Sequence, residues 1–394
     1  MRWQKIWGLV LVFCLMMPVR VWAETGQEEP RKELEGLQDT APSIEEFRTE
    51  DIQQFLDSLA RSQGGAAGRF SFEEMMDELM AGNLADVLKQ GASDCTDVLF
   101  SEIRTNRSLM GQIIILAIIG AVFSGFSGIF GSGHVTETGF YVVYLLIMTF
   151  LAASFFSSVG IASRVTGELL EFMKVLLPAY FLAVAAAGGA LTSAAVCGFT
   201  FGAIGVVQVV LAELLIPLTR IYMLLVLAGN LMKEDMISKC TELLEHVILW
   251  TLKTMFGIVV GFHVVQSMIL PQADALKNAS VMRLAQIIPG VGAAAGSITQ
   301  MILGSGVLIK NTAGVAGVLV MIFMAAVPLI KLLILMCFYY LAGAVMQPVC
   351  DKRLVACMTG AAVGHGILLK IVAYSMALFA ATIAVLCIST NGVW

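Results

Sequence analysis

The sequence predicts an all-α, polytopic integral membrane protein of about eight transmembrane helices, preceded by a short helical region outside the cytoplasm. Of its 394 residues, 58% are hydrophobic and only 13% are charged, whereas a typical soluble domain has about 25% charged residues. The mean hydropathy is +0.86. From residue 109 onward, apolar runs reach the roughly 20 residues that a helix needs to cross a bilayer.

Residues 1–23 have the organisation of a cleavable secretory signal peptide. The bases Arg2 and Lys5 precede an apolar core from Ile6 to Met17, and Val21-Trp22-Ala23 forms the exit from this core. A basic start, a short apolar core and a small residue at the exit fit a signal peptide better than a permanent span. An uncleaved signal anchor is the alternative.

Residues 24–108 form an acidic region that the signal peptide would place outside the cytoplasm. Between Glu24 and Arg107 there are 19 acidic and 8 basic side chains. Ser43-Ile44-Glu45-Glu46 and Ser71-Phe72-Glu73-Glu74 match the capping box that begins many helices. The helices they predict have too few apolar residues for a large core, so they rest on the membrane or a partner, or form a small bundle of their own. These apolar residues are Phe47, Phe55, Leu56, Leu59, Met76, Leu79, Leu84 and Leu88.

Residues 109–394 form the predicted transmembrane domain. The two longest apolar runs contain Pro217 and Pro328, which predicts kinked or broken helices there. The expected spans lie near residues 109–130, 139–162, 175–197, 199–231, 247–270, 285–308, 312–346 and 363–388.

The transmembrane domain also contains a predicted internal repeat, with units near 139–231 and 247–346. Ile216-Pro217-Leu218-Thr219-Arg220 corresponds to Val327-Pro328-Leu329-Ile330-Lys331, 111 residues further on. Three spans in each unit, an odd number, would place the copies in inverted orientation, as in many transporters. If each proline divides its run into two spans, the copies are parallel; chance similarity between apolar segments is the further alternative.

Charged residues within the apolar runs are candidate functional residues, because each costs about 3 kcal/mol or more at the centre of a bilayer unless it is paired or hydrated. Glu213 and Arg220 are seven residues apart, and Lys331 is the repeat counterpart of Arg220; Lys253 and Lys370 lie in other spans. These bases either extend to the membrane interface or form a cationic pair, with Glu213, that lines a hydrated path or a subunit contact.

A glycine-rich stretch, residues 286–317, supplies the remaining candidates. Gly292 and Gly296 lie one helical turn apart, a spacing that permits close helix packing in lipid. A hinge or a pore lining is the alternative role for these two glycines and for Gly304. The order Gly290-x-Gly292-x-x-Ala295 resembles a dinucleotide-binding loop, but no acidic residue follows about 20 positions on. We therefore expect no bound cofactor.

Enzymatic chemistry has one weak candidate. Gly125-Phe126-Ser127-Gly128 matches the nucleophile loop of rhomboid-type intramembrane proteases, which need a histidine base from another span; His263 or His365 could supply it. The sequence contains no His-Glu-x-x-His motif and no cluster of Cys and His residues, so metal catalysis is not expected. Nothing in the charge pattern suggests nucleic-acid binding.

Two segments resemble the stage III sporulation protein AE family of endospore-forming bacteria. They are GSGVLIKNTAGVAG, which includes Lys310, Asn311, Gly314 and Gly317, and LAGAVMQPVCDKR, from Leu341 to Arg353. The resemblance implies a non-enzymatic protein of the outer forespore membrane, made in the mother cell. With other stage III A proteins and a forespore membrane protein, it would form a secretion-like complex as a channel or permease-like subunit. A passive scaffold is the alternative, and a homo-oligomer remains open.

Overall fold

The computed structural model describes residues 49–63, 71–84, isolated positions between 89 and 122, and then 133–186, 190–231, 237–285, 292–348 and 350–390. All of them belong to one compact unit, Pro42–Trp394. The expected signal peptide, the first capping box and most of the expected span at 109–130 lie outside the described residues.

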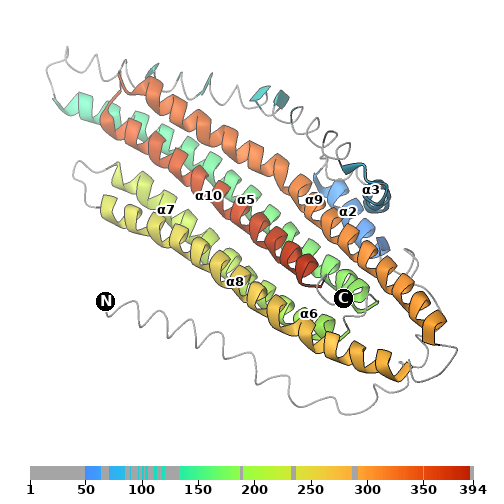
Figure 1. Ribbon diagram of the computed structural model, residues 1–394. Coiled ribbons are helices and arrows are strands. Elements are labelled where there is room, and N and C mark those ends of the chain that lie inside the picture. The colour runs from blue at the N-terminus through green and yellow to red at the C-terminus, as the bar shows by residue number, and fades with distance from the viewer. Residues whose placement is uncertain are drawn as a thin grey trace, which may run out of the picture. The chain divides into compact units, whose positions relative to one another are not determined.

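Five long helical elements make up most of the described chain (Figure 1). Each has an apolar segment of 29 to 42 residues, long enough to cross a membrane. The chain is therefore an all-α, multi-pass membrane protein, with five candidate spans in its described part where we expected eight over the whole chain. The elements are α5 (Gly133–Ala186), the continuous run α6 (Ala190–Gln208), η4 (Val209–Leu215) and α7 (Ile216–Gly229), then α8 (Ser238–Ala285), α9 (Gly292–Met346) and α10 (Lys352–Thr390).

In two places the structure has one continuous helix where the sequence predicts two spans. We expected separate spans at 139–162 and 175–197, but α5 is continuous across residues 163–174. The charged residues there, such as Glu168 and Glu171, lower the hydropathy but favour helix. Similarly, α9 continues through Lys310 and Asn311, where two spans were expected to meet.

Such long helices extend beyond a single bilayer. With 54 residues, α5 is about 80 Å long, whereas the hydrocarbon core of a bilayer is about 30 Å thick. Tilting cannot absorb this difference, because membrane helices are rarely tilted by more than about 40°. Part of the helical bundle therefore lies outside the hydrocarbon.

The two prolines that were expected to disturb their helices behave differently. Pro217 lies in the first turn of α7, directly after the π-helix η4. Proline lacks a backbone N–H and collides with the carbonyl of the preceding turn, and a wider π-turn relieves both problems. Pro328, in contrast, lies within the uninterrupted α9, so the expected irregularity is found only at Pro217.

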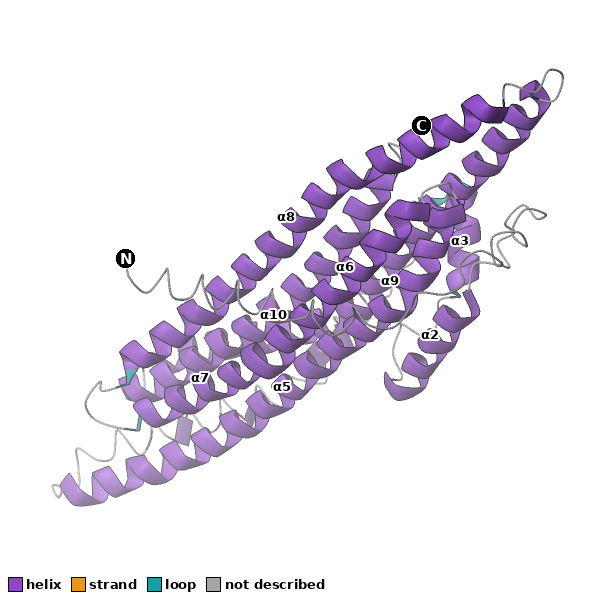
Figure 2. Ribbon diagram, turned by 90° about the horizontal axis from the view of Figure 1, so that it is seen from below, coloured by secondary structure: helices purple, strands orange, loops and turns teal. Residues whose placement is uncertain are grey.

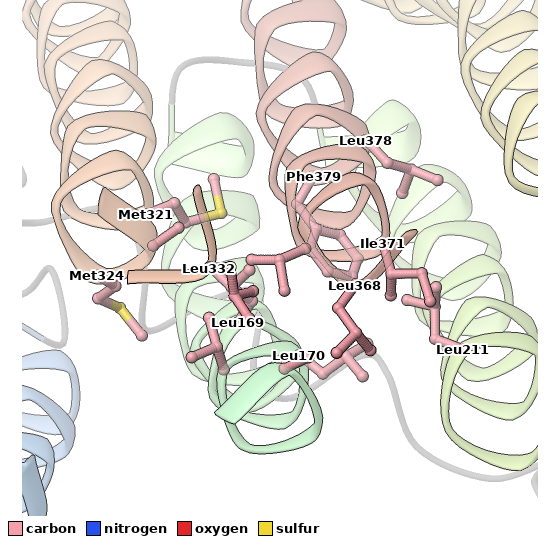
Figure 3. Close-up of a cluster of buried hydrophobic side chains, with 14 of the residues drawn as sticks. Leu169, Leu170, Leu211, Met321, Met324, Leu332, Leu368, Ile371, Leu378 and Phe379 are labelled. Atoms are coloured by element: carbon pink, nitrogen blue, oxygen red, sulfur yellow. The ribbon is translucent and has the colours of Figure 1, made fainter. Parts of the chain in front are cut away.

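Helix α10 lies at the centre of the bundle. It packs against α5, α7, α8 and α9, and Figures 1 and 2 show it among these helices. Its side chains are buried on all faces around His365, from Gly364 to Leu368. Figure 3 shows how its apolar residues Leu368, Ile371 and Phe379 meet side chains of α5, η4 and α9.

Contacts between neighbouring helices fix their directions. Ser158 and Tyr180 of α5 contact His365 and Cys387 of α10, so α5 and α10 run parallel. Both α6–α7 and α9 run antiparallel to α5. The contacts that show this are Tyr144 with Leu227 and Lys174 with Gln208 for α6–α7, and Ser154 with Tyr339 and Leu176 with Gly317 for α9.

These directions bear on the expected repeat. The segments around Pro217 and Pro328 lie in α7 and α9, which point the same way. Each proposed unit contains two long helical elements rather than three spans, and an even number does not invert a copy. The described helices therefore do not support an inverted arrangement of the two units.

The acidic region contributes two short described helices, α2 (Thr49–Gln63) and α3 (Phe72–Met80). Ser71 caps α3, with its hydroxyl accepting a hydrogen bond from the Glu74 N–H, as its capping box predicts. Besides contacting each other, α2 packs on α5 and α3 on α9; the rings of Phe55 and Phe172 lie 6.0 Å apart. The helices therefore rest on the chain's own transmembrane domain.

Candidate functional site

A buried histidine joins α5 and α10 near the middle of the bundle. The Ser158 hydroxyl lies 3.1 Å from His365 Nε2, and His365 Nδ1 lies 2.8 Å from the Ala361 carbonyl. A carbonyl can only accept, so Nδ1 carries the hydrogen and Nε2 is the acceptor facing the serine. The single hydroxyl hydrogen of Ser158 has two acceptors in reach, His365 Nε2 and the Ser154 carbonyl, which is also 3.1 Å away. Both side chains are at most 1% exposed.

Aromatic rings close the space around this pair. The Tyr339 hydroxyl donates to Ser154 Oγ at 2.6 Å, and its ring centroid lies 4.8 Å from that of His365. On the other side, the Phe155 ring stands edge-on to the imidazole at 5.4 Å. The four polar side chains Ser154, Ser158, Tyr339 and His365, which we call the central polar cluster, thus connect α5, α9 and α10.

The central polar cluster does not support the protease hypothesis. Ser158 and His365 have the separation of a nucleophile and its base, but both are fully buried and a substrate has no access to them. Ser127, the expected nucleophile, lies outside the described residues. The sequence points to Ser154 and Ser158 only through their spacing of four residues in an apolar run, and it does not point to Tyr339.

The segment most specific to the family resemblance lies where α9 crosses α5 and α10. Lys310 is fully buried and shares a face with Gly314 and Gly317. A methyl group at Gly314 would collide with Cys387, and one at Gly317 would lie 2.5 Å from Leu176. A larger residue at either position would force the Cys387 or Leu176 side chain to move, because the helices approach closely here.

The other glycine candidates are placed differently. Gly292 is the first residue of α9 and Gly296 follows one turn later. Gly304 is exposed, and no atom lies within 4 Å of the position of an added Cβ. Close packing is therefore seen at Gly314 and Gly317 and not at Gly304, and the packing role expected for Gly292 and Gly296 stays a prediction.

Lys310 and its neighbour Asn311 are polar groups held within the bundle. The Lys310 side chain lies near Cys387 at the end of α10. The side-chain oxygen of Asn311 is buried without a hydrogen-bond partner. This end of α9 therefore combines close packing with an unusual number of enclosed polar groups.

The charged candidates face outward. Glu213, in η4, and Arg220, in α7, are both exposed, and Lys331, in α9, is half-buried. No ion pair joins Glu213 to Arg220, both of which the structure describes. The π-helix lies between them, so the two-turn spacing of a regular α-helix does not apply.

Four bases from four helices nevertheless share one level of the bundle. Contacts of Ser158 with His365, Phe256 with Tyr374, and Gly366 with Met336 align α5, α8 and α9 with α10. Arg164, Lys253 and Lys331 each lie within two helical turns of one of these contacts, in the direction that brings them to the level of Lys370 in α10. We call Arg164, Lys253, Lys331 and Lys370 the basic belt; all are exposed except the half-buried Lys331.

Two further features bear on binding. No group of three or more potential metal ligands occurs within the residues that the structure describes. Between α2 and α5, a hollow of about 480 Å³ is lined by Asp51, Gln54, Phe55, Lys174, Val175, Pro178 and Ala179. Its two opposite charges come from the acidic region and the transmembrane domain.

The fold and its sites define a multi-pass helical membrane protein. Its central polar cluster and its close contacts at Gly314 and Gly317 join neighbouring helices. Residues 70–390 match the family model of stage III sporulation protein AE, and the chain belongs to this family. A stage III sporulation protein AE from Bacillus subtilis (strain 168) is 23% identical over 324 residues, covering 81% of this chain and 79% of that protein. No solved structure shows a significant match. The family resemblance of the sequence is thereby confirmed, and neither description names an enzymatic activity.

Proposed function

We propose that this chain is a membrane component of a secretion-like channel complex between mother cell and forespore, in which it acts as a channel or permease-like subunit. Membership of the sporulation family supports the setting. The observation that carries the proposal is the length of the helices, since 54 and 55 residues in α5 and α9 reach well beyond one bilayer. A subunit that continues a path outside its membrane needs such an extension.

The same proposal assigns the chain's orientation and partners. The signal peptide at 1–23 exports the acidic region 24–108, and α2 and α3 fold back onto the transmembrane domain. The chain lies in the outer forespore membrane, with its acidic region towards the forespore. Its partners are other stage III A proteins and a protein of the forespore membrane.

The outward-facing charges fit a subunit contact better than an internal path. Glu213 and Arg220 are exposed, and a residue that lines a path through a single bundle would instead face α10. We therefore assign Glu213, Arg220 and Lys331 to the outer surface, where another subunit or lipid headgroups can pair with them.

A passive scaffold is the second candidate, and the glycines favour it. Gly314, Gly317 and Gly364 all lie where an added methyl group would collide with a neighbouring helix. Glycines of this kind serve helix packing, which a scaffold needs as much as a conduit does.

A bulky substitution at Gly304 separates the two functions. Because Gly304 has no neighbour within 4 Å, Gly304→Leu should leave the fold and the co-purification of other stage III A proteins intact. If the path runs between subunits along this exposed face of α9, we expect loss of spore formation despite normal assembly. Normal spore formation, or a defect in assembly alone, would support the scaffold. Ser127→Ala should sporulate normally, and failure to do so would revive the protease hypothesis.

A further inference from the structure

Helices α6 and α8 bring polar side chains together at the end of the bundle where α10 ends. The rings of Phe199 and Phe262 meet edge-to-face at 5.8 Å, which places the next residues, Thr200 and His263, at the same level of two neighbouring helices. Both are buried, with exposed fractions of 0% and 2%. Gln266, one turn further along α8, is 8% exposed.

These three side chains contain buried polar atoms without hydrogen-bond partners. They are Thr200 Oγ1, His263 Nδ1, and both the oxygen and the nitrogen of the Gln266 amide. His263 and Gln266 are near enough to interact electrostatically, but no hydrogen bond of normal geometry joins them. We call the three residues the α6–α8 polar site.

Several comparable residues in the bundle are satisfied. The hydroxyls of Thr219, Ser375 and Thr382 each donate to the carbonyl four residues earlier, and both nitrogens of His365 have partners. Thr166 and Asn311 each leave one buried oxygen without a partner, whereas the α6–α8 polar site holds four such atoms on two neighbouring helices. An unsatisfied buried polar group costs about 1 to 3 kcal/mol, and native proteins generally pair such groups with protein or with ordered water, so the α6–α8 polar site favours a ligand that can form hydrogen bonds.

We propose that Thr200, His263 and Gln266 bind water in a hydrated site between α6 and α8. A hydroxyl, an imidazole and a primary amide offer both donors and acceptors, and none is a carboxylate that would favour a cation. A buried water typically makes about three hydrogen bonds to otherwise unsatisfied groups, so the unpaired atoms match one or two waters.

Few side chains cover the site from outside. Gln266 is the most exposed of its three residues. Gly198, Gly202 and Gly261, on the outer faces of the same helices, are exposed and carry no side chain. A water bound at the site would be enclosed in an otherwise apolar bundle.

Hydration of the site deepens the proposed function, and only the role assigned to the water rests on that function. In a conduit, the α6–α8 polar site would form part of the polar path. This would place the path between α6 and α8 and away from the exposed Arg220. Binding of water can be measured on the protein alone, without reference to transport.

Histidine-selective solid-state NMR tests the hydration directly. The full-length protein, labelled with ¹⁵N at its histidines, is placed in lipid bilayers, and magnetisation is transferred from water to the imidazoles. We expect the His263 signal to grow as fast as that of the exposed His246, while the matched buried His365 lags behind. A His263 signal as slow as that of His365 would overturn the proposal.

Substitutions distinguish the binding of water at the site from a role of that water in the conduit. Thr200→Val with Gln266→Leu should abolish the rapid transfer to His263, whereas the matched control Thr219→Val should not; rapid transfer that persists would remove these residues from the site. Spore formation is measured for the same variants. If hydration is lost while spore formation stays normal, the role in the conduit is wrong and the water site stands. A dry site in a protein that still supports spore formation refutes the site and leaves the proposed function intact.

Discussion

Gly364 of α10 lies so close to Phe155 of α5 that a methyl group on its α-carbon would be only 2.8 Å from the ring. This contact adjoins the hydrogen bond between His365 and Ser158. Small size at position 364 thus allows the two parallel helices to approach until their polar side chains meet. The formation of the central polar cluster therefore depends on the close packing of α10 against α5 at Gly364.

Gly364→Ala should therefore destabilise the protein, although alanine favours helix. Overpacking typically costs about 1 to 3 kcal/mol, which exceeds the gain of about 1 kcal/mol from replacing a helical glycine. Gly304→Ala is the matched control, because its Cβ would meet nothing within 4 Å, and it should be neutral or slightly stabilising. Unfolding of the purified protein in detergent measures both; equal stability of the two variants would contradict the packing argument.

Ser158→Ala should destabilise the protein by leaving His365 Nε2 buried and unpaired. The expected loss is about 1 to 3 kcal/mol, as for other unsatisfied buried groups. Ser375→Ala provides the control, because this equally buried hydroxyl bonds only to the Ile371 carbonyl of its own helix and its removal orphans no other side chain. The same unfolding assay applies, and a larger effect at Ser375 would argue against the bond between Ser158 and His365.

Arg220→Ala and Lys331→Ala should each leave the stability of the isolated protein almost unchanged. Arg220 is exposed and Lys331 half-buried, and surface substitutions usually change stability by no more than about 0.5 kcal/mol. If the two bases contact another subunit, the double variant should lose co-purifying stage III A proteins while it keeps its melting temperature. Sporulation and co-purification at wild-type levels in the double variant would rule out a functional role for this pair.

The basic belt should lie at one depth in the membrane, near the lipid headgroups. Lysine or arginine is costly in the hydrocarbon, and four outward-directed bases spread over four helices can all be satisfied by a headgroup layer. Labels on Lys253→Cys and Lys370→Cys, in a protein without other cysteines, should be quenched most strongly by lipids with quenchers near the headgroup. Labels at clearly different depths would show that the helices are not aligned as described.

The sequence predicted the helical membrane class, the Ser71 cap and the family, because each depends on local composition or on a short motif. It could not predict the number of long helices, since residues such as Glu168 reduce hydropathy and still propagate a helix. The sequence could not predict the central polar cluster either. Ser158 and His365 are 207 residues apart, and only the packing of α5 against α10 brings them together.

The same limit applies to the charged candidates. Arg220 and Lys331 are candidates because they are charged residues within apolar runs, but a position in an apolar run does not tell which side of the helix faces the bundle. The π-helix before Pro217 changes the rotation of Glu213 relative to Arg220, and no pattern in the sequence announces it. The packing expected at Gly292 and Gly296 stays a prediction, whereas close packing is found at Gly314 and Gly317, where only the tertiary arrangement of the helices reveals it.

Cys350, in the short connection between α9 and α10, should react slowly with alkylating reagents at neutral pH. Burial and the nearby Asp351 carboxylate both raise its pKa above the ordinary value. Because the thiolate is the reactive form, its alkylation should be slow near pH 7 and should keep accelerating as the pH rises past the ordinary thiol pKa. Single-cysteine proteins that retain Cys350 or the exposed Cys240 allow the pH profiles to be compared. Asp351→Asn keeps an oxygen to accept from the Arg353 N–H but removes the negative charge, so it should shift the Cys350 profile to lower pH; an unchanged profile would mean that the carboxylate does not act on this thiol.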